Sequence, residues 1–355
     1  MDRRELEDRF LSAEAELKTF VVEAHVESTP ANLHDVFGTT AEVSKTDDAF
    51  LWGVSTDRAE LWIDALDPRF WSVHTWSPSG DARRFLKERI ERRRDLDFMW
   101  IPSTHLERIR SAQFDSFGSR FRANVLIADR GMESMRIAAS GRDSEELIEY
   151  IRGNPKFSGA LAVHEIGFDE RDDELGCTRE VVNREGRFRA KGDSFALHQA
   201  VVSRAVGAYR AFVDLIEQRA IRVTGIDEGG WRYDGVPILL QFSQPVADLD
   251  RLLAILFSSS EPYRLWGVPR EVGDGLFHVE AVDLHVGRRV PMDVTDRWLR
   301  FHLDENGCGN SVTRLITNLQ HTVDADVRLV DPQRQSALAE PRDATATPSA
   351  GVNPP

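Results

Sequence analysis

The chain has 355 residues, 41% of them hydrophobic and 9% aromatic, which is typical of a folded protein with two or three domains. Its 59 acidic residues outnumber the 45 basic ones, and the net charge of −14 argues against a general nucleic-acid coating protein. Two cysteines exclude a disulfide scaffold, and no apolar run is long enough to cross a membrane. We therefore expect a cytoplasmic protein with no membrane partner.

Arginine carries almost all of the positive charge, since only five of the basic residues are lysines. An acidic, arginine-rich surface is produced both by adaptation to a high-salt cytoplasm and by GC-rich codon usage. A halophilic origin is therefore one of two explanations for this composition.

The patterns of apolar residues predict an α+β protein whose parts follow one another along the chain. The two outer parts are units of the order β-α-β-β-β-α-β, with antiparallel-rich sheets and helices on one face. In chain order we predict an N-terminal helix (1–19), a first α+β unit (20–118), a middle α+β segment (119–193), a long helix (194–220), a second α+β unit (221–331) and a disordered tail (332–355).

The two outer units are interpreted as copies of one another. "FLWGV" at residues 50–54 recurs as "RLWGV" at 264–268, and "RFWSVH" at 69–74 matches "RWLRFH" at 297–302. This alignment places Trp52 on Trp266 and His74 on His302. The second copy is predicted to contain Val236–Phe242, Ala247–Ser258, Tyr263–Val268, Leu276–Val286, Arg297–Leu303, Ser311–Thr322 and Ala325–Val330.

Alternation along the strands predicts one apolar sheet face under the helices and one face rich in Trp, Asp, His and Arg. In the segment 276–286 we expect Val282, Leu284 and Val286 to point inward and Asp283 and His285 outward. The candidate ligand-binding residues of the second copy are Asp283, His285, Trp298, Arg300, His302, Asn310, Ser311 and Arg314. Their counterparts in the first copy are Trp62, Asp64, His74, Trp76 and Arg84.

Three functions are compatible with such a face. It can be an interface between the sheets or within a homo-oligomer, or it can bind an anionic ligand or nucleic acid through stacking aromatics and Arg or His contacts. The order of elements resembles the tandem α/β units of the TATA-binding and ferredoxin-like classes, although no motif of either family is present. Binding or assembly is favoured. The alternative is an enzyme that acts on a phosphorylated or other anionic substrate through Asp283, His285, Arg300 and His302.

The glycine-rich turn "GCGNS" at residues 307–311 precedes a predicted helix. Backbone N–H groups at such a turn can bind an anion, but a tight turn with Asn310 or Ser311 as helix cap is favoured. No Cys-x-x-Cys or His-Glu-x-x-His motif is present, so a zinc site would need ligands scattered along the chain. We therefore predict no metal, no cofactor and no catalytic residue, and we do not expect Cys308 to act as a nucleophile.

Overall fold

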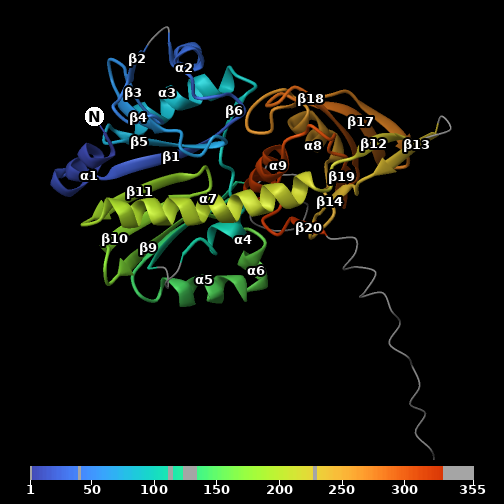
Figure 1. Ribbon diagram of the computed structural model, residues 1–355. Helices are drawn as coiled ribbons and strands as arrows, with labels where there is room; N and C mark the ends of the chain where they lie inside the picture. Colours follow the sequence, from blue (N-terminus) through green and yellow to red (C-terminus); the bar gives the residue numbers. More distant parts are fainter. Residues whose placement is uncertain (1, 39–40, 111–114, 123–133, 227–229, 331–355) are drawn as a thin grey trace, which may run out of the picture.

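The computed structural model describes residues 2–38, 41–110, 115–122, 134–226 and 230–330 (Figure 1). The prediction of a mixed α+β protein is confirmed, because helices accompany two large antiparallel sheets. The tail predicted from residue 332 lies outside this part of the chain. In the part that the structure describes, no helix has both the length and the apolar character needed to span a bilayer.

The first unit follows a short N-terminal helix, α1 (Arg3–Ser12), which begins with a capping box between Asp2 and Glu5. Its sheet buries Leu61 and Ile63 against two helices, where they meet Leu33 and Leu86. The elements of this unit are β1 (Leu17–Ala24), α2 (Pro30–Phe37), β2 (Glu42–Lys45), β3 (Leu51–Ser55), β4 (Glu60–Asp64), β5 (Phe70–Thr75), α3 (Ser79–Glu91) and β6 (Leu96–Phe98).

The middle segment continues the same sheet, because β11 pairs with β1. The result is an eleven-stranded sheet in the order β2-β3-β4-β5-β1-β11-β10-β9-β7-β8, with β6 also paired to β1. We count with this segment α4 and β7, which begin before the predicted boundary at residue 119, because β7 pairs with β9. The segment then consists of α4 (Ser103–Leu106), β7 (Ser116–Arg122), β8 (Ser134–Ser140), α5 (Ser144–Arg152), α6 (Pro155–Ser158), β9 (Val163–Asp172), β10 (Gly176–Asn183) and β11 (Arg187–Gly192).

A long helix, α7 (Phe195–Glu217), runs across the molecule from the first sheet to the second unit (Figure 1). Ser194 caps it by accepting a hydrogen bond from the backbone N–H of Leu197. Val201 and Val213 on this helix are fully buried against the middle segment. The helix therefore covers a face of the large sheet.

The second unit has its own seven-stranded sheet in the order β15-β17-β18-β19-β14-β20, with β16 paired to β17. A two-stranded hairpin precedes it along the chain. The elements are β12 (Arg222–Ile226), β13 (Gly230–Asp234), β14 (Ile238–Gln241), α8 (Leu249–Leu256), β15 (Leu265–Trp266), β16 (Pro269–Gly273), β17 (Leu276–Asp283), β18 (Arg288–Val294), β19 (Trp298–Phe301), α9 (Gly309–Thr322) and β20 (Arg328–Val330).

The two outer units share an order of strands. The first sheet contains β3-β4-β5-β1 with β6 beside β1, and the second contains β17-β18-β19-β14 with β20 beside β14. In this order β3 corresponds to β17, whereas Trp266 lies on the edge strand β15. The predicted match of Trp52 with Trp266 is therefore wrong, because two similar pentapeptides lie on strands at different positions in their sheets.

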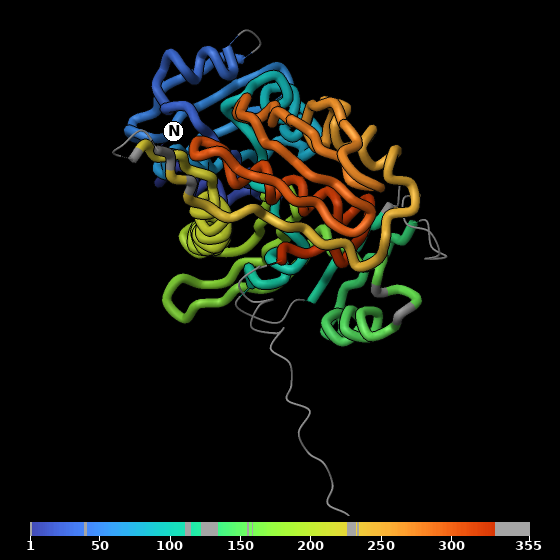
Figure 2. Tube along the Cα trace, turned by 90° about the vertical axis from the view of Figure 1, so that its right-hand side faces the viewer, coloured from blue at the N-terminus to red at the C-terminus, as the bar shows by residue number. Residues whose placement is uncertain are grey.

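Helix α9 lies at the centre of the molecule, between the second sheet and the rest of the chain (Figure 2). Its polar residues are buried and make contacts on several sides. The Asn310 side-chain amide donates to the Phe98 carbonyl, and the Gln320 side-chain carbonyl accepts from the Ser103 N–H. These bonds join the second unit to the first unit and to the middle segment.

Candidate metal centre

The predicted site residues fall into three separate places. Asp283, His285, Asn310, Ser311 and Arg314 are all buried where the second unit meets the first. Arg314 forms ion pairs with both Asp283 and Asp97, and the Ser311 hydroxyl donates to Asp283. These residues do not share a surface with Arg300 and His302, so the predicted cluster of four is not assembled.

The predicted orientation of strand β17 is wrong. Val279, Ala281 and Asp283 point toward the helices and are fully buried, whereas Val282 is partly exposed. Apolar residues occur at both alternating positions of this segment, so the sequence supported either orientation. The consequence is that Asp283 lies inside the protein and not on the outer sheet face.

The helix cap predicted at Asn310 or Ser311 is also wrong. Helix α9 begins after Cys308 without a side-chain cap, because the side chains of Asn310 and Ser311 bond elsewhere. The first N–H of the helix, that of Gly309, donates to Glu217 over 2.9 Å. A protein carboxylate thus takes the position at which a ligand anion would bind.

The outer face of the second sheet is accessible and carries Trp298, Arg300 and His302. The Arg300 guanidinium lies 5.6 Å from the centre of the Trp298 ring and forms an ion pair of 2.6 Å with Asp293. Asp293 also accepts from His278 over 2.8 Å. The positive charge of Arg300 is therefore largely compensated by its own sheet.

The counterpart residues of the first unit are mostly interior. Trp62, Asp64, His74 and Trp76 are buried, and only Arg84 is exposed. The two tryptophans pack against α1, in a cluster with Leu6 and Phe10. Asp64 pairs with Arg3 over 2.8 Å.

His74 belongs to a buried chain of hydrogen bonds. Its Nδ1 lies 2.9 Å from the Thr19 hydroxyl, which lies 2.8 Å from Nε2 of His198. The Nδ1 of His198 in turn lies 3.0 Å from Glu180. These residues satisfy one another within the interior of the protein.

A group of metal-binding side chains occurs where the two units meet. One ligand atom from each of Glu23, His25, His285 and Cys308 lies within 4.8 Å of the others. Glu23 and His25 come from the end of β1 and just beyond it, and His285 follows β17. Cys308 immediately precedes α9. Two imidazoles, a carboxylate and a thiol form a donor set suited to Zn²⁺ and related transition metals.

Several of these ligand atoms are buried and have no hydrogen-bond partner among the described residues. They are Nδ1 and Nε2 of His285 and Oε2 of Glu23. Burying polar atoms without partners is unfavourable by about 1–3 kcal/mol for each group. A bound cation would satisfy one nitrogen of His285 and Oε2 of Glu23 and would so remove part of this cost.

Hydrogen bonding, burial and nearby charges affect three of the candidate metal ligands, Glu23, His285 and Cys308. The Arg69 Nε donates to Oε1 of Glu23 over 2.7 Å, so Oε2 stays free to bind a metal. Burial lowers the pKa of His285, despite nearby carboxylates that act in the opposite direction. Burial and the Glu23 charge raise the pKa of the Cys308 thiol. A neutral imidazole and a carboxylate oxygen are therefore available, and a metal would have to displace the thiol proton.

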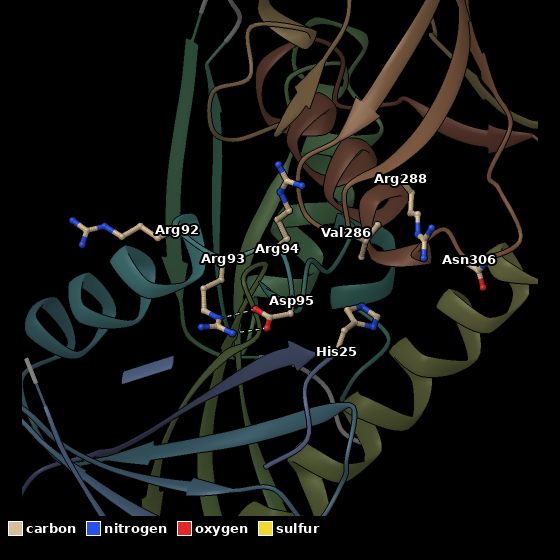
Figure 3. A pocket seen from close by; sticks show the side chains of 8 residues that line it. All are labelled: His25, Arg92, Arg93, Arg94, Asp95, Val286, Arg288 and Asn306. Carbon is tan, nitrogen blue, oxygen red and sulfur yellow. Dashed lines mark hydrogen bonds and ion pairs between the residues drawn. The ribbon is translucent and has the colours of Figure 1, made fainter. Parts of the chain in front are cut away.

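An arginine-lined cavity of about 520 Å³ opens beside His25. Its side chains come from the end of β1, from the segment after α3 and from the segment between β17 and β18 (Figure 3). Arg93 is held by Asp95 and Asp35, whereas Arg94 and Arg288 have no ion-pair partner in the part of the chain that the structure describes. This cavity therefore presents uncompensated positive charge next to the metal-binding group.

Arg94 crosses closely over the backbone of Gly287, which has a φ of +69°. A Cβ at this position would lie 3.3 Å from the Arg94 guanidinium. A glycine here permits both the left-handed turn and the close approach of Arg94.

The buried charges behind the metal-binding group are balanced. Burial alone would raise the pKa of Asp97, but the charges of Arg314 and Arg264 hold that pKa below its usual value. Burial would likewise raise the pKa of Asp283, but the charge of Arg314 and the hydrogen bond from Ser311 lower it. Both carboxylates are therefore ionised, and together they stabilise Arg314.

Sequence reasoning missed Glu23, His25 and Cys308 as a group. One signal was available: Glu23-x-His25 and Asp283-x-His285 each place an acid and a histidine two residues apart at the end of a strand. Which residues of these two pairs come into contact depends on how the first unit packs against the second. The local sequence pattern does not predict that packing.

The fold and the site thus define an α+β protein with two similarly ordered units and a candidate metal centre between them. The chain belongs to the family of MJECL33-like proteins, whose family model matches residues 2–338. It is similar to the uncharacterized protein MJECL33 of Methanocaldococcus jannaschii, with 25% identity over 368 residues that cover 91% of this chain and 88% of the relative. The description of that relative names no activity.

Proposed function

We propose that this protein is a metal-dependent enzyme that acts on an anionic, phosphate-bearing substrate. The observation that carries this proposal is the position of His25, which belongs both to the metal-binding group and to the wall of the arginine-lined cavity. A ligand held in that cavity would therefore lie next to the metal. An enzyme acting on a phosphorylated or other anionic substrate was the alternative to binding or assembly in the sequence analysis, but there Asp283, His285, Arg300 and His302 carried the chemistry and no metal was expected.

The residues of the group divide into distinct roles. Glu23, His25, His285 and Cys308 would hold the metal, and Arg69 would orient the Glu23 carboxylate through the bond to its Oε1. When bound, a divalent metal supplies Lewis-acid polarisation and lowers the pKa of a coordinated water.

Arg94 and Arg288 are the residues that would bind the substrate anion. Neither has a carboxylate partner in the described part of the chain, so each is free to form charge-assisted hydrogen bonds to phosphate oxygens. Arg93 differs because it forms an ion pair with Asp95. It would instead fix the shape of the cavity wall.

Metal content tests the first half of the proposal, and the two cysteines provide a matched pair. We expect about one transition-metal ion per chain after incubation with Zn²⁺, measured by inductively coupled plasma mass spectrometry. Cys308→Ser and His285→Ala should reduce this content by at least about tenfold, while Cys177→Ser should retain it. Equal metal content in the two cysteine variants would refute the site.

Hydrolysis of p-nitrophenyl phosphate and bis(p-nitrophenyl) phosphate tests the second half. Activity should disappear on dialysis against EDTA and return with the metal. Arg288→Gln should raise KM, whereas Arg289→Gln on the neighbouring position should leave it unchanged, because Arg289 pairs with Glu280 on the sheet. A protein that binds the metal tightly but hydrolyses neither compound would have a structural metal joining the two units.

We also propose that the two outer units arose by duplication. The shared strand order supports this, as does the alternation of β5 and β19, which places His74 and His302 at like positions relative to buried Val73 and Phe301. A structural superposition of residues 17–98 on 238–330 that failed to align β1 with β14 and α3 with α9 would contradict it.

The accessible face of the second sheet supports a second candidate function, binding or assembly through Trp298, Arg300 and His302. The observation that favours it is the exposed Arg300 side chain beside an aromatic ring. An anionic ligand or a second copy of the chain would meet this face. A protein that remains monomeric and binds no oligonucleotide in low salt would argue against it.

A further inference from the structure

A second arginine-rich cavity, of about 390 Å³, lies where the middle segment meets α3 and α9. Its arginines and histidines are Arg83, Arg120, Arg184, Arg187, His164 and His321, and the carboxylate of Glu185 also lines it. Residues from four strands and two helices thus contribute to one cavity, and none of them belongs to the candidate metal centre.

Arg184 has no carboxylate partner among the described residues. Its Nη1 lies 3.4 Å from the Asn318 side-chain oxygen, and its guanidinium lies 5.9 Å from the centre of the Trp100 ring. The adjacent carboxylate, Glu185, is instead held by Arg83 through bonds of 2.7 to 2.9 Å. Burial lowers the pKa of Arg184. A cation without a counter-ion at a partly buried position is unfavourable unless an anion joins it.

The two histidines supply further free polar atoms. Nδ1 of His321 donates to the Arg120 carbonyl over 2.8 Å, so its other ring nitrogen, Nε2, is left to accept. His321 is only 5% exposed, and its Nε2 has no hydrogen-bond partner within the described ranges. Nδ1 of His164 is buried and unpartnered in the same way. The rings of the two histidines lie 6.5 Å apart.

We propose that this cavity binds the phosphate group of a small organic phosphate. Arg120 and Arg184 would contact its oxygens, and Nε2 of His321 would accept a hydrogen bond from a protonated phosphate oxygen or become protonated when the dianion binds. The protein carries a net charge of −14, so an anion would reach this position because of local side chains and not because of the overall field.

An adjoining cavity of about 270 Å³ indicates where the organic part of the ligand would lie. It shares Arg83 and Arg184 with the first cavity, and Trp100, Ile90 and Pro262 contribute an apolar wall. A planar ring next to an arginine-bound phosphate is the arrangement that a nucleoside monophosphate would satisfy. The ligand class is therefore a phosphate ester with an apolar or aromatic group.

Calorimetric titration of the full chain with AMP, adenosine and inorganic phosphate tests the proposal. AMP should bind more tightly than phosphate, and adenosine should not bind detectably. Arg184→Gln and Arg120→Gln should each weaken AMP binding by at least about tenfold, since each removes a charge-assisted contact. Arg289→Gln, which lies outside both arginine-lined cavities and pairs with Glu280, should change the affinity by less than about twofold.

Other outcomes would overturn the proposal. They are an absence of AMP binding, equal binding by the wild type and Arg120→Gln, and loss of binding in Arg94→Gln alone, which would place the phosphate beside the candidate metal centre. Arg120 is exposed, so this variant decides the matter if Arg184→Gln does not fold. In addition, AMP should shift the ¹⁵N resonance of His321 Nε2, which a purely structural histidine would not show.

Discussion

The two outer units share part of their strand order and bury the same kind of sheet face against helices, but the opposite faces of their sheets have different surroundings. In the first sheet, α1 covers Trp62 and Trp76, which are 3% and 8% exposed. In the second sheet, Trp298 is partly exposed, and the side chain of Arg300 is 46% exposed. Alternation along a strand therefore identifies residues that share a face, whereas the elements added around a unit decide whether that face is interior or surface.

Truncating a tryptophan on each face gives the largest expected contrast. Trp62 packs edge to face on Trp76, with ring centres 5.5 Å apart, and Arg9 lies 4.7 Å from its ring centre. Trp62→Ala should lower the free energy of unfolding by about 3–5 kcal/mol, because it leaves a cavity in a packed cluster. Trp298→Ala should lower it by less than about 1 kcal/mol. Urea unfolding followed by circular dichroism measures both values.

A milder substitution at Trp62 serves as the control. Trp62→Phe should recover much of the loss, since an aromatic ring still fills the space beneath α1. If Trp62→Ala and Trp298→Ala prove equally destabilising, the two outer faces are equally buried in solution, and the comparison between them fails.

The interior between the units gives a second large effect. Arg314 is fully buried and balances Asp97 and Asp283. Arg314→Met should reduce the free energy of unfolding by about 3–5 kcal/mol, because two buried carboxylates lose their shared counter-ion. The triple variant Arg314→Met, Asp97→Asn, Asp283→Asn should be more stable than Arg314→Met alone in the same urea titration. A triple variant of lower stability would show that the ion pairs do not account for the loss.

Acid should affect the two faces differently. Burial, followed by the charge of His198, lowers the pKa of His74 to about 3, although Asp64 acts in the opposite direction. In the unfolded chain a histidine titrates near 6.5. Above that pH both states are neutral; as the pH falls below it, only the unfolded state takes up the proton, and stability is lost until the pH approaches 3.

His74 alone should therefore reduce the free energy of unfolding by about 2 kcal/mol between pH 7 and pH 5. Urea titrations across this range should show a smaller pH dependence in His74→Gln than in the wild type. His302→Gln should change the dependence less, because the half-buried His302 keeps more contact with water. An identical pH dependence in the wild type and His74→Gln would mean that His74 is not buried as a neutral group.

Much of the fold follows from local sequence. The alternation of the segment 60–64 puts Leu61 and Ile63 on one face of a strand, and they lie together on the helix side of the first sheet. The orientation of β17 was not determined in this way, because Val279 and Ala281 compete with Val282 and Leu284 for the inner face. In the folded protein the inner face holds Val279 and Ala281 in the core, and Asp283 there contacts Ser311 and Arg314 of α9.

The candidate metal centre was beyond local reasoning for a different reason. Glu23 and Cys308 are 285 positions apart, and their approach depends on the docking of one unit against the other. The acid-x-His spacing at the ends of β1 and β17 is visible in the sequence, but it does not show that His25 and His285 would face each other with ring centres 5.3 Å apart. The arginine positions in the sequence also did not predict the cavity beside His25, since a basic run on a helix is usually exposed to solvent.

Arg300 gives the smallest expected effect and the sharpest test of the open face. Its guanidinium is nearly half exposed and is paired with Asp293, so water screens much of the interaction. Arg300→Ala should lower the free energy of unfolding by no more than about 1 kcal/mol in urea titrations. Part of the loss reflects packing of Arg300 on Trp298 and should persist in 1 M salt, whereas the contribution of the ion pair should vanish there. A loss of several kcal/mol would instead show that another surface covers this face in solution, because only a buried arginine is so costly to remove. In that case the two sheets would resemble each other in burial, and the binding of a free anionic ligand at Trp298 and His302 would have to be abandoned in favour of assembly through this face.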